Sequence, residues 1–264
     1  MDLPSDGFGK KNATIGKTIS LRMKLALKRF EIEGAKYEIG YEIVNKEKDK
    51  DIVFLHGWGS DRGLMKRVFS SYLGDFRHIY VDLPGFGKSP NEEVLSSYDY
   101  ARIVEGFLKE IGAKKDIVVG HSFGGKVATL LEPDLLVLLS SAGILWPKPL
   151  KVRAKIALFK LLKPFGKDLR HLFVSEDAKG MSEAMYETFK RVVDEDFTPI
   201  FANYPRRALI VWGREDSATP LKSGEKIHEL IKKSRLEILE GDHYFFLDKG
   251  AVIEKLIKEE YERL

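Results

Sequence analysis

The chain has 264 residues, a hydrophobic share of 44% and no cysteine. It is therefore long enough for one α/β core with an insertion, and disulfides, thiolate metal sites, iron–sulfur clusters and a cysteine nucleophile are excluded. The 44 basic and 40 acidic residues leave a net charge of +4, which describes a mixed charged surface and not a nucleic-acid-binding stripe. No apolar run is long enough to cross a bilayer, so we expect a cytoplasmic protein without membrane insertion.

The chain begins with a tail and the first strands of a sheet. Residues 1–17 contain several glycines and few apolar side chains, so we expect a flexible tail outside the fold. From Ile19 to Leu27 apolar and polar residues alternate, which predicts a strand; a basic segment lying on a membrane surface is the alternative. A second strand is expected over 36–44, followed by a charged hairpin turn at 45–50.

A third predicted strand, residues 51–55, runs directly into His56-Gly57-Trp58-Gly59. Two glycines around Trp58 let the backbone pass close to a reacting group, so the Trp58 N–H is a candidate donor to an oxyanion. The alternative is an ordinary strand-to-helix turn in which the Trp58 side chain fills the core.

A helix over 64–73, a strand over 77–81 and a second helix over 97–111 are expected before the next motif. The loop from Asp82 to Ser89 lies between this strand and the second helix, and it contains proline and several glycines. We favour a structural role for this loop, because glycine turns most often serve geometry and Asp82 leaves its strand too early to be the obvious catalytic acid.

The stretch from Asp116 to Leu131 carries the strongest functional signal. A short β-branched run enters the corner Gly120-His121-Ser122-Phe123-Gly124 and leaves as an apolar pattern at helical spacing. A G-x-S-x-G sequence between a strand and a helix places the serine on a tight elbow, with its hydroxyl exposed above the sheet. The beginning of the helix supplies the Phe123 N–H, which we expect to bind an oxyanion together with that of Trp58.

The region after the elbow breaks the alternation of strands and helices. A strand is expected over 135–139, but residues 144–205 show helical patterns without a convincing strand. We predict that they form a helical cap inserted between two parts of an α/β core, 18–143 and 206–264. Basic residues prevail in the first half of this insertion and acidic residues in the second. Either the two halves pair with each other, or the basic half steers an anionic substrate or an acidic carrier protein to the pocket.

The last part of the chain contributes two further polar residues that follow strands. Strands over 207–211 and 236–239 alternate with helices over 221–231 and 248–261. Asp216 and His243 come just after these strands, as Ser122 does earlier in the chain. Such positions meet at the carboxyl edge of a parallel sheet, and the order Ser, Asp, His is that of nucleophile-elbow hydrolases.

These three residue types suit nucleophilic catalysis. A serine hydroxyl is a poor nucleophile until a base removes its proton, and the imidazole of His243 titrates near neutrality. Asp216 would hold the His243 tautomer and stabilise the imidazolium. His56, Gly57 and His121 lie in the same loops and are expected to shape the substrate pocket.

Five motifs, in this order, resemble the α/β-hydrolase superfamily. They are H-G-W-G at 56–59, D-L-P-G-F-G-K-S at 82–89, G-H-S-F-G-G at 120–125, W-G-R-E-D-S-A-T-P at 212–220 and G-D-H at 241–243. The resemblance implies an α/β-hydrolase fold, with a mostly parallel eight-stranded sheet flanked by helices and a helical cap inserted between the sixth and seventh strands.

Within that superfamily the chain is similar to two groups of enzymes. The first two motifs resemble carboxylesterases that cleave pimeloyl-carrier-protein methyl ester. The predicted cap and the sequence P-G-F-G-K-S are similar to those of carbon–carbon bond hydrolases that act on ring-cleavage (meta-cleavage) products such as 2-hydroxy-6-oxohepta-2,4-dienoate. Those enzymes commonly carry Asn before the nucleophile, where this chain has His121.

The sequence therefore leads to one main hypothesis and two alternatives. The main hypothesis is a serine hydrolase, without cofactor or metal, that cleaves carboxylic esters or thioesters through an acyl-enzyme on Ser122. The first alternative is a carbon–carbon bond hydrolase of an oxo-dienoate that uses the same triad. The second is a non-catalytic protein of the same fold that binds a small ligand under the cap. No nucleic acid partner is expected, and the sequence does not determine the oligomeric state.

Overall fold

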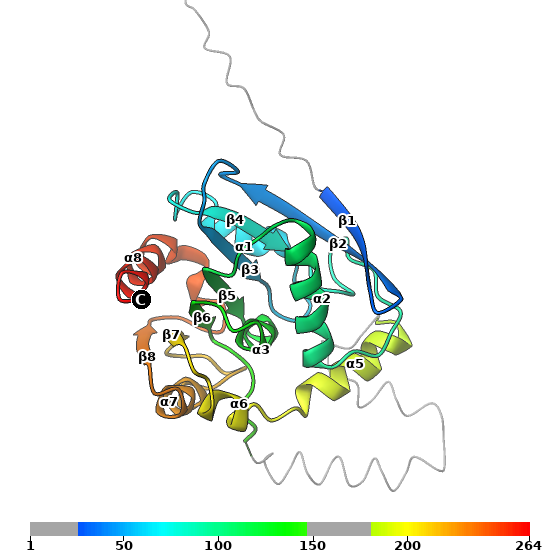
Figure 1. Cartoon of the computed structure of the whole chain (residues 1–264). Coiled ribbons are helices and arrows are strands. Elements are labelled where there is room, and N and C mark those ends of the chain that lie inside the picture. Colours follow the sequence, from blue (N-terminus) through cyan, green and yellow to red (C-terminus); the bar gives the residue numbers. More distant parts are fainter. Residues whose placement is uncertain (1–25, 147–180) are drawn as a thin grey trace, which may run out of the picture.

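A single eight-stranded sheet forms the centre of the computed structural model, which describes residues 26–146 and 181–264 (Figure 1). The strands lie in the order β1-β2-β4-β3-β5-β6-β7-β8. Their bounds are β1 Ala26–Ile32, β2 Ala35–Val44, β3 Asp51–Leu55, β4 Arg77–Val81, β5 Ile117–His121, β6 Leu135–Leu139, β7 Arg207–Gly213 and β8 Ser234–Leu239. The pairs β1–β2 and β2–β4 are antiparallel and the other pairs are parallel, which confirms the expected mostly parallel sheet.

The N-terminal part of the sheet differs from the sequence-based expectation. β1 begins at Ala26, so only the end of the alternating stretch 19–27 belongs to it, and residues 19–25 lie outside the described part of the chain. The hairpin turn expected at 45–50 is wrong, because β2 pairs with β1 and β4 and not with β3. β4 separates β2 from β3 because its side chains from His78 to Val81 are all fully buried, and a buried strand needs a hydrogen-bonded neighbour on each side.

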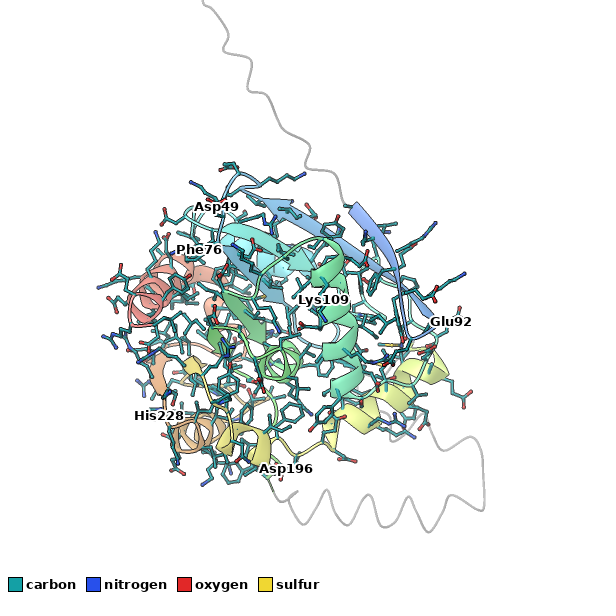
Figure 2. All side chains as sticks on the ribbon, in the orientation of Figure 1. Asp49, Phe76, Glu92, Lys109, Asp196 and His228 are labelled. Carbon is teal, nitrogen blue, oxygen red and sulfur yellow. The ribbon has the colours of Figure 1, made fainter. Side chains whose placement is uncertain are left out.

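Helices cover both faces of the sheet. α2, α3 and α7 pack on one face, and α1 and α8 pack on the other. Figure 2 shows charged and polar side chains such as Lys109, Asp49 and His228 at the outer surface of these layers. The bounds of the helices are α1 Arg62–Phe69, α2 Ser97–Glu110, α3 Phe123–Leu130, α5 Glu183–Val193, α6 Thr198–Ala202, α7 Leu221–Leu230, α8 Gly250–Tyr261 and the short 3-10 helix η4 Phe245–Asp248.

Part of the predicted domain organisation lies outside the description. This holds for the tail at 1–17 and for residues 147–180 of the predicted cap, with most of its basic half. The described remainder of that insertion contains α5 and α6, so both of its elements are helical, as the pattern indicated.

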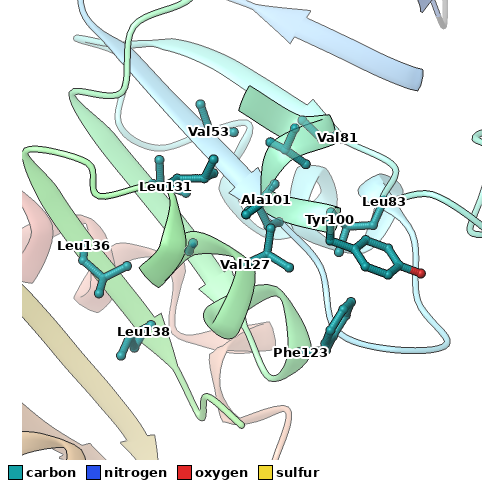
Figure 3. Close-up of a cluster of buried hydrophobic side chains, with 14 of the residues drawn as sticks. Val53, Val81, Leu83, Tyr100, Ala101, Phe123, Val127, Leu131, Leu136 and Leu138 are labelled. Atoms are coloured by element: carbon teal, nitrogen blue, oxygen red, sulfur yellow. The ribbon is translucent and has the colours of Figure 1, made fainter. Parts of the chain in front are cut away.

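The core consists of two apolar layers, one on each face of the sheet. All residues of β3, β5 and β6 are buried, which is typical of parallel strands covered on both faces. Figure 3 shows the layer beneath α2 and α3, where Val127 and Leu131 lie over the sheet near Val53. In the same layer the ring of Phe123, at the beginning of α3, contacts the ring of Tyr100 of α2 edge to face at 4.9 Å. The start of α3 is therefore anchored in the core.

We predict that Phe54 is one of the residues on which folding stability most depends. Its ring is fully buried and stacks between Phe69 at 5.1 Å and Tyr80 at 4.7 Å, measured between ring centroids. Phe54→Ala should lower the free energy of unfolding by about 3 to 5 kcal/mol, because it leaves a cavity in a layer that cannot collapse easily. Urea unfolding followed by circular dichroism measures this. Val252→Ala, at a position 43% exposed on α8, is the control and should cost less than about 0.5 kcal/mol; similar losses for both variants would contradict the prediction.

Candidate active site

Ser122 lies at the corner between β5 and α3 in a strained backbone conformation, with φ 51° and ψ −114°. Residues other than glycine rarely adopt such a φ, and the conformation costs about 1 to 3 kcal/mol. Three backbone hydrogen bonds hold it: Ser122 N–H donates to Leu139 O at 3.1 Å, and the N–H groups of Gly125 and Ala142 donate to Ser122 O at 3.0 Å. The surrounding sheet and helix therefore impose the serine's position.

The two glycines of G-x-S-x-G are required by close backbone contacts. A Cβ at Gly124 would lie 2.5 Å from Leu55 O at the end of β3, and a Cβ at Gly120 would clash with the main chain at Gly124. Neither glycine has a positive φ. Glycine is therefore required at these positions because a side chain would not fit, and not because of the backbone conformation. The absence of these side chains brings α3, β5 and the end of β3 together around Ser122.

Asp216 and His243 follow β7 and β8 and form a hydrogen-bonded pair. His243 Nδ1 lies 2.8 Å from Asp216 Oδ2. The other carboxylate oxygen, Oδ1, accepts the N–H groups of Ala218 at 2.9 Å and Thr219 at 2.8 Å. Burial raises the pKa of Asp216, but the hydrogen bonds from His243 and from the backbone outweigh it and hold the pKa below its usual value. The carboxylate is thus charged at neutral pH and fixed in orientation.

Thr219 belongs to this group, and the sequence analysis missed it. Its Oγ1 lies 2.8 Å from Asp216 Oδ2, 3.2 Å from His243 Nδ1 and 3.1 Å from Ser140 O. The spacing carried a signal, because an aspartate that accepts N–H groups two and three residues later forms a common local turn. The hydroxyl adds a third polar contact around the Asp216–His243 hydrogen bond.

His121 links the serine loop to the histidine loop. Its Nε2 donates to the main-chain oxygen of His243 at 3.0 Å, and the two imidazole rings are 4.7 Å apart between centroids. Ser122 is the next residue along the chain and is partly exposed. Within the described residues no hydrogen bond joins the Ser122 hydroxyl to His243. Catalytic hydrogen bonds of this kind often tighten only when substrate binds.

Burial makes His121 a neutral residue. It is 1% exposed, and desolvation, together with the nearby His243, lowers its pKa to about 3. Its Nδ1 has no hydrogen-bond partner among the described residues and faces Gly57, where a Cβ would lie only 2.8 Å away. Gly57 therefore permits the close approach of the two loops.

His56 connects two other loops of the site. It is fully buried, with Nδ1 2.8 Å from Gly57 O and Nε2 accepting the N–H of Leu83 at 3.1 Å. These partners require a proton on Nδ1, and burial lowers the pKa of the ring. Its contribution to the pocket is thus indirect, because it holds the loop after β3 against the loop after β4.

The two expected oxyanion donors belong to neighbouring segments, Trp58 to the loop after β3 and Phe123 to the first turn of α3. Neither the Trp58 N–H nor the Phe123 N–H donates to another residue in the described ranges. The two side chains meet edge to face, with ring centroids 5.4 Å apart. A Cβ at Gly57 would lie 3.2 Å from Ser122 Cβ, which shows how closely the loop before Trp58 approaches the serine. Two unpartnered backbone donors therefore flank the corner.

Asp82 organises the loop that follows β4. Its side chain is fully buried, forms an ion pair with Arg62 and accepts the N–H of Lys88 at 2.8 Å. A Cβ at Gly87 would overlap the carboxylate, so this glycine is needed for the contact. The structural role expected for the loop is consistent with these bonds.

A cavity of about 960 Å³ opens beside Trp58. The loop 85–91 forms one side, Met181 and Met185 from the end of the predicted cap form another, and Tyr244 lies at the histidine end. In the part of the chain that the structure describes, no three metal-ligating side chains cluster and no helix is both long and apolar enough to span a membrane.

Comparisons with known proteins agree with this architecture. The alpha/beta hydrolase family matches residues 52–255. The pimeloyl-[acyl-carrier protein] methyl ester esterase of Neisseria meningitidis serogroup B is 28% identical over 244 residues, which cover 80% of this chain and 92% of that protein. The uncharacterized hydrolase YugF of Bacillus subtilis is 26% identical, with coverage of 80% and 88%.

Solved structures show the same fold. An esterase from Exiguobacterium antarcticum superposes with a TM-score of 0.67 at 23% identity, covering 86% of this chain and 96% of that one. A meta-cleavage product hydrolase from Pseudomonas fluorescens has a TM-score of 0.67 at 20% identity, covering 89% and 97%. The fold and the family match define a hydrolase of α/β type. The chain belongs to the alpha/beta hydrolase family.

The buried neutral His121 predicts a measurable loss of stability in acid. In the unfolded chain this histidine has a pKa near 6.5 and is protonated below that pH, whereas in the folded chain it stays neutral until the pH is near 3. The free energy of unfolding therefore falls as the pH drops below about 6.5. At pH 4.5 this amounts to about 2 to 3 kcal/mol relative to neutral pH. Urea unfolding at pH 7 and pH 4.5 should show a smaller pH-dependent loss in His121→Asn than in the parent protein.

The control for this measurement is His228→Asn, because His228 is exposed. This variant should keep the full pH dependence of the parent protein. The assignment of a neutral, buried His121 is contradicted when both substitutions change the difference between the two pH values by the same amount.

Proposed function

We propose that the protein is a cofactor-independent serine hydrolase that cleaves carboxylic esters or thioesters, with Ser122 as nucleophile, His243 as base and Asp216 as the acid that orients it. The observation that carries this proposal is the 2.8 Å hydrogen bond between Asp216 and His243 beside a serine held in a strained corner. The local strain at Ser122 supports it further, because such conformations cluster at functional sites.

The proposed reaction follows from where the protons lie. Asp216 fixes the His243 tautomer with the proton on Nδ1, which leaves Nε2 free to take the proton of Ser122 as its oxygen attacks the carbonyl carbon. The N–H groups of Trp58 and Phe123 stabilise the negative charge on the carbonyl oxygen. Protonated His243 then gives its proton to the leaving alcohol or thiol, and an acyl-Ser122 forms. Water, deprotonated by His243, hydrolyses this ester and restores the serine.

The cavity beside Trp58 is large enough to hold a small-molecule substrate. Its volume of about 960 Å³ lies at the upper end of what small-molecule sites provide, and Phe86, Met181 and Met185 give it apolar walls. Among its described lining residues the only cation is Lys88 and the only carboxylate is Glu38, which is paired with Arg29. Lys88 would pair with the carboxylate of an oxo-dienoate, so the charges of the lining do not exclude that alternative, which the substrate panel decides.

Two parts of the proposal depend on the similarity to the Neisseria enzyme. That protein is called an esterase of a methyl ester on an acyl-carrier protein, which supports an ester and raises an acidic carrier as a possible partner for this chain. The basic half of the predicted cap, where a carrier would dock, lies mostly within residues 147–180 and outside the description. We propose a cytoplasmic enzyme with small-molecule esters as the first class to test.

The proposed function is tested with a panel of substrates. p-Nitrophenyl esters from acetyl to decanoyl, methyl pimelate and an oxo-dienoate are assayed with the parent protein, Ser122→Ala and the exposed control Ser71→Ala. We expect turnover of esters that Ser122→Ala loses by at least about a thousandfold and Ser71→Ala retains, and phosphonate labelling of Ser122 alone. Faster turnover of the oxo-dienoate than of any ester favours the carbon–carbon alternative, and no turnover or labelling at all favours a non-catalytic binder.

We also predict a large effect of Asp216→Asn. This change allows the wrong His243 tautomer, so kcat should fall about a thousand- to ten-thousandfold with little change in the free energy of unfolding. The matched control is Asp242→Asn, next to His243 in sequence, where Oδ1 only accepts the N–H of Tyr244 at 2.8 Å. Its kcat should remain within about threefold of the parent value. Equal losses in the two variants would remove Asp216 from the proposed triad.

A further inference from the structure

A buried lysine lies one helical turn after Ser122. Lys126 of α3 is 2% exposed, although lysine is almost never fully buried without partners. Its Nζ donates to Val192 O at 2.6 Å and to Glu195 O at 3.2 Å, and it lies 3.2 Å from Glu195 Oε2. The ring of Phe197 lies 4.4 Å away. All of these partners belong to α5 and the segment that follows it.

The same segment is tied to the beginning of α2. Glu195 Oε1 accepts the N–H of Ser97 at 3.0 Å, so one carboxylate joins the lysine of α3 to the N-terminus of α2. Thr188 Oγ1 of α5 accepts the N–H of Leu95 at 3.0 Å. Figure 1 shows α5 lying beside that end of α2. The described half of the predicted cap is therefore anchored to the core through specific polar contacts.

α5 also forms a wall of the cavity beside Trp58. The ring of Phe189 lies 5.2 Å from that of Trp58, one of the expected oxyanion donors. Met185 lines the cavity and packs against Gly85. Its sulfur lies 3.5 Å from Asn91 Nδ2. Any shift of α5 relative to α3 therefore changes the shape of the cavity beside Trp58.

We propose that Lys126 is a positioning residue that fixes α5 against the nucleophile helix, and that this anchor sets which acyl chains fit in the cavity lined by Met185 and Trp58. The inference rests on the proposed function for its choice of substrate. An apolar side chain would serve packing alone at lower desolvation cost. The ammonium group instead supplies donors to two backbone carbonyls and one carboxylate at the end of α5. Loss of the Glu195 charge leaves the buried ammonium with carbonyl partners alone, and loss of Lys126 leaves the partly buried Glu195 carboxylate with only the Ser97 N–H.

The first arm of the test needs no substrate. Hydrogen exchange measured by mass spectrometry compares the parent protein with Lys126→Met, Glu195→Gln and the double variant. We expect amides of α5 to exchange about tenfold faster in each single variant, with less effect in the double variant because no buried charge is left alone. Amides of α8 should not change, and unchanged exchange in α5 of Lys126→Met overturns the anchor.

The matched control is Lys115→Met. Lys115 also binds a carboxylate and a carbonyl, Glu105 of α2 at 2.7 Å and Leu131 O at 2.7 Å, but at the opposite end of α3 from Ser122. It should leave exchange in α5 as it is in the parent protein. An equal increase in α5 for both lysine variants would indicate general loosening and overturn the specific anchor.

The second arm measures chain selection. In Lys126→Met, KM for the p-nitrophenyl ester with the best-fitting long chain should rise about tenfold, KM for the acetyl ester less than twofold, and kcat for either less than threefold. An equal rise for both chain lengths, or a fall in kcat alone, overturns the role in selection. Absence of ester turnover and of Ser122 labelling in the parent protein instead refutes the proposed function, and the exchange arm still decides the anchor.

Discussion

The approach of main chains at the elbow is the constraint on which the rest of the site depends. Gly124 brings α3 so close to the end of β3 that Leu55 O would lie 2.5 Å from any Cβ there. The same approach of main chains lies beside the loop with Trp58, where a Cβ at Gly57 would lie 3.2 Å from Ser122 Cβ. Parallel strands buried on both faces make this corner rigid, and rigidity is what lets the chain keep a serine at φ 51°.

The three histidines around this corner differ in burial, and burial determines whether each imidazole is held neutral. His56 and His121 are both buried, and Nε2 of each forms a hydrogen bond with a main-chain group of a neighbouring loop. Desolvation keeps them neutral, so they serve as fixed spacers. His243 is partly exposed and faces a carboxylate. This partly exposed position beside a carboxylate is the basis for proposing His243, rather than His56 or His121, as the base.

Patterns within one segment were predictable from the sequence, and contacts between distant segments were not. The strands β4 and β6 occur at the predicted residues, because their apolar runs are short and bounded by turn residues. The prediction of a hairpin at 45–50 was wrong, because no residue in that segment indicates that β4 lies between β2 and β3 in the sheet. Asp216 was predicted as a site residue from its position after a strand. The role of Lys126 was not predicted, because it lies within a helical pattern and its partners are 66 and 69 residues away in the sequence.

The partners of Lys126 bear on how an inserted cap can belong to an active site. A segment that merely covered a pocket would need apolar contacts alone, and these tolerate small sliding motions. Directional bonds from Lys126 and Glu195 tolerate such motions poorly, because each displaced bond leaves a buried polar group unsatisfied. The end of α5 is thereby tied to the helix that follows Ser122, and these bonds are the physical basis of the proposed link between Lys126 and substrate selection. This coupling gives a physical reason for a charge in an otherwise apolar layer.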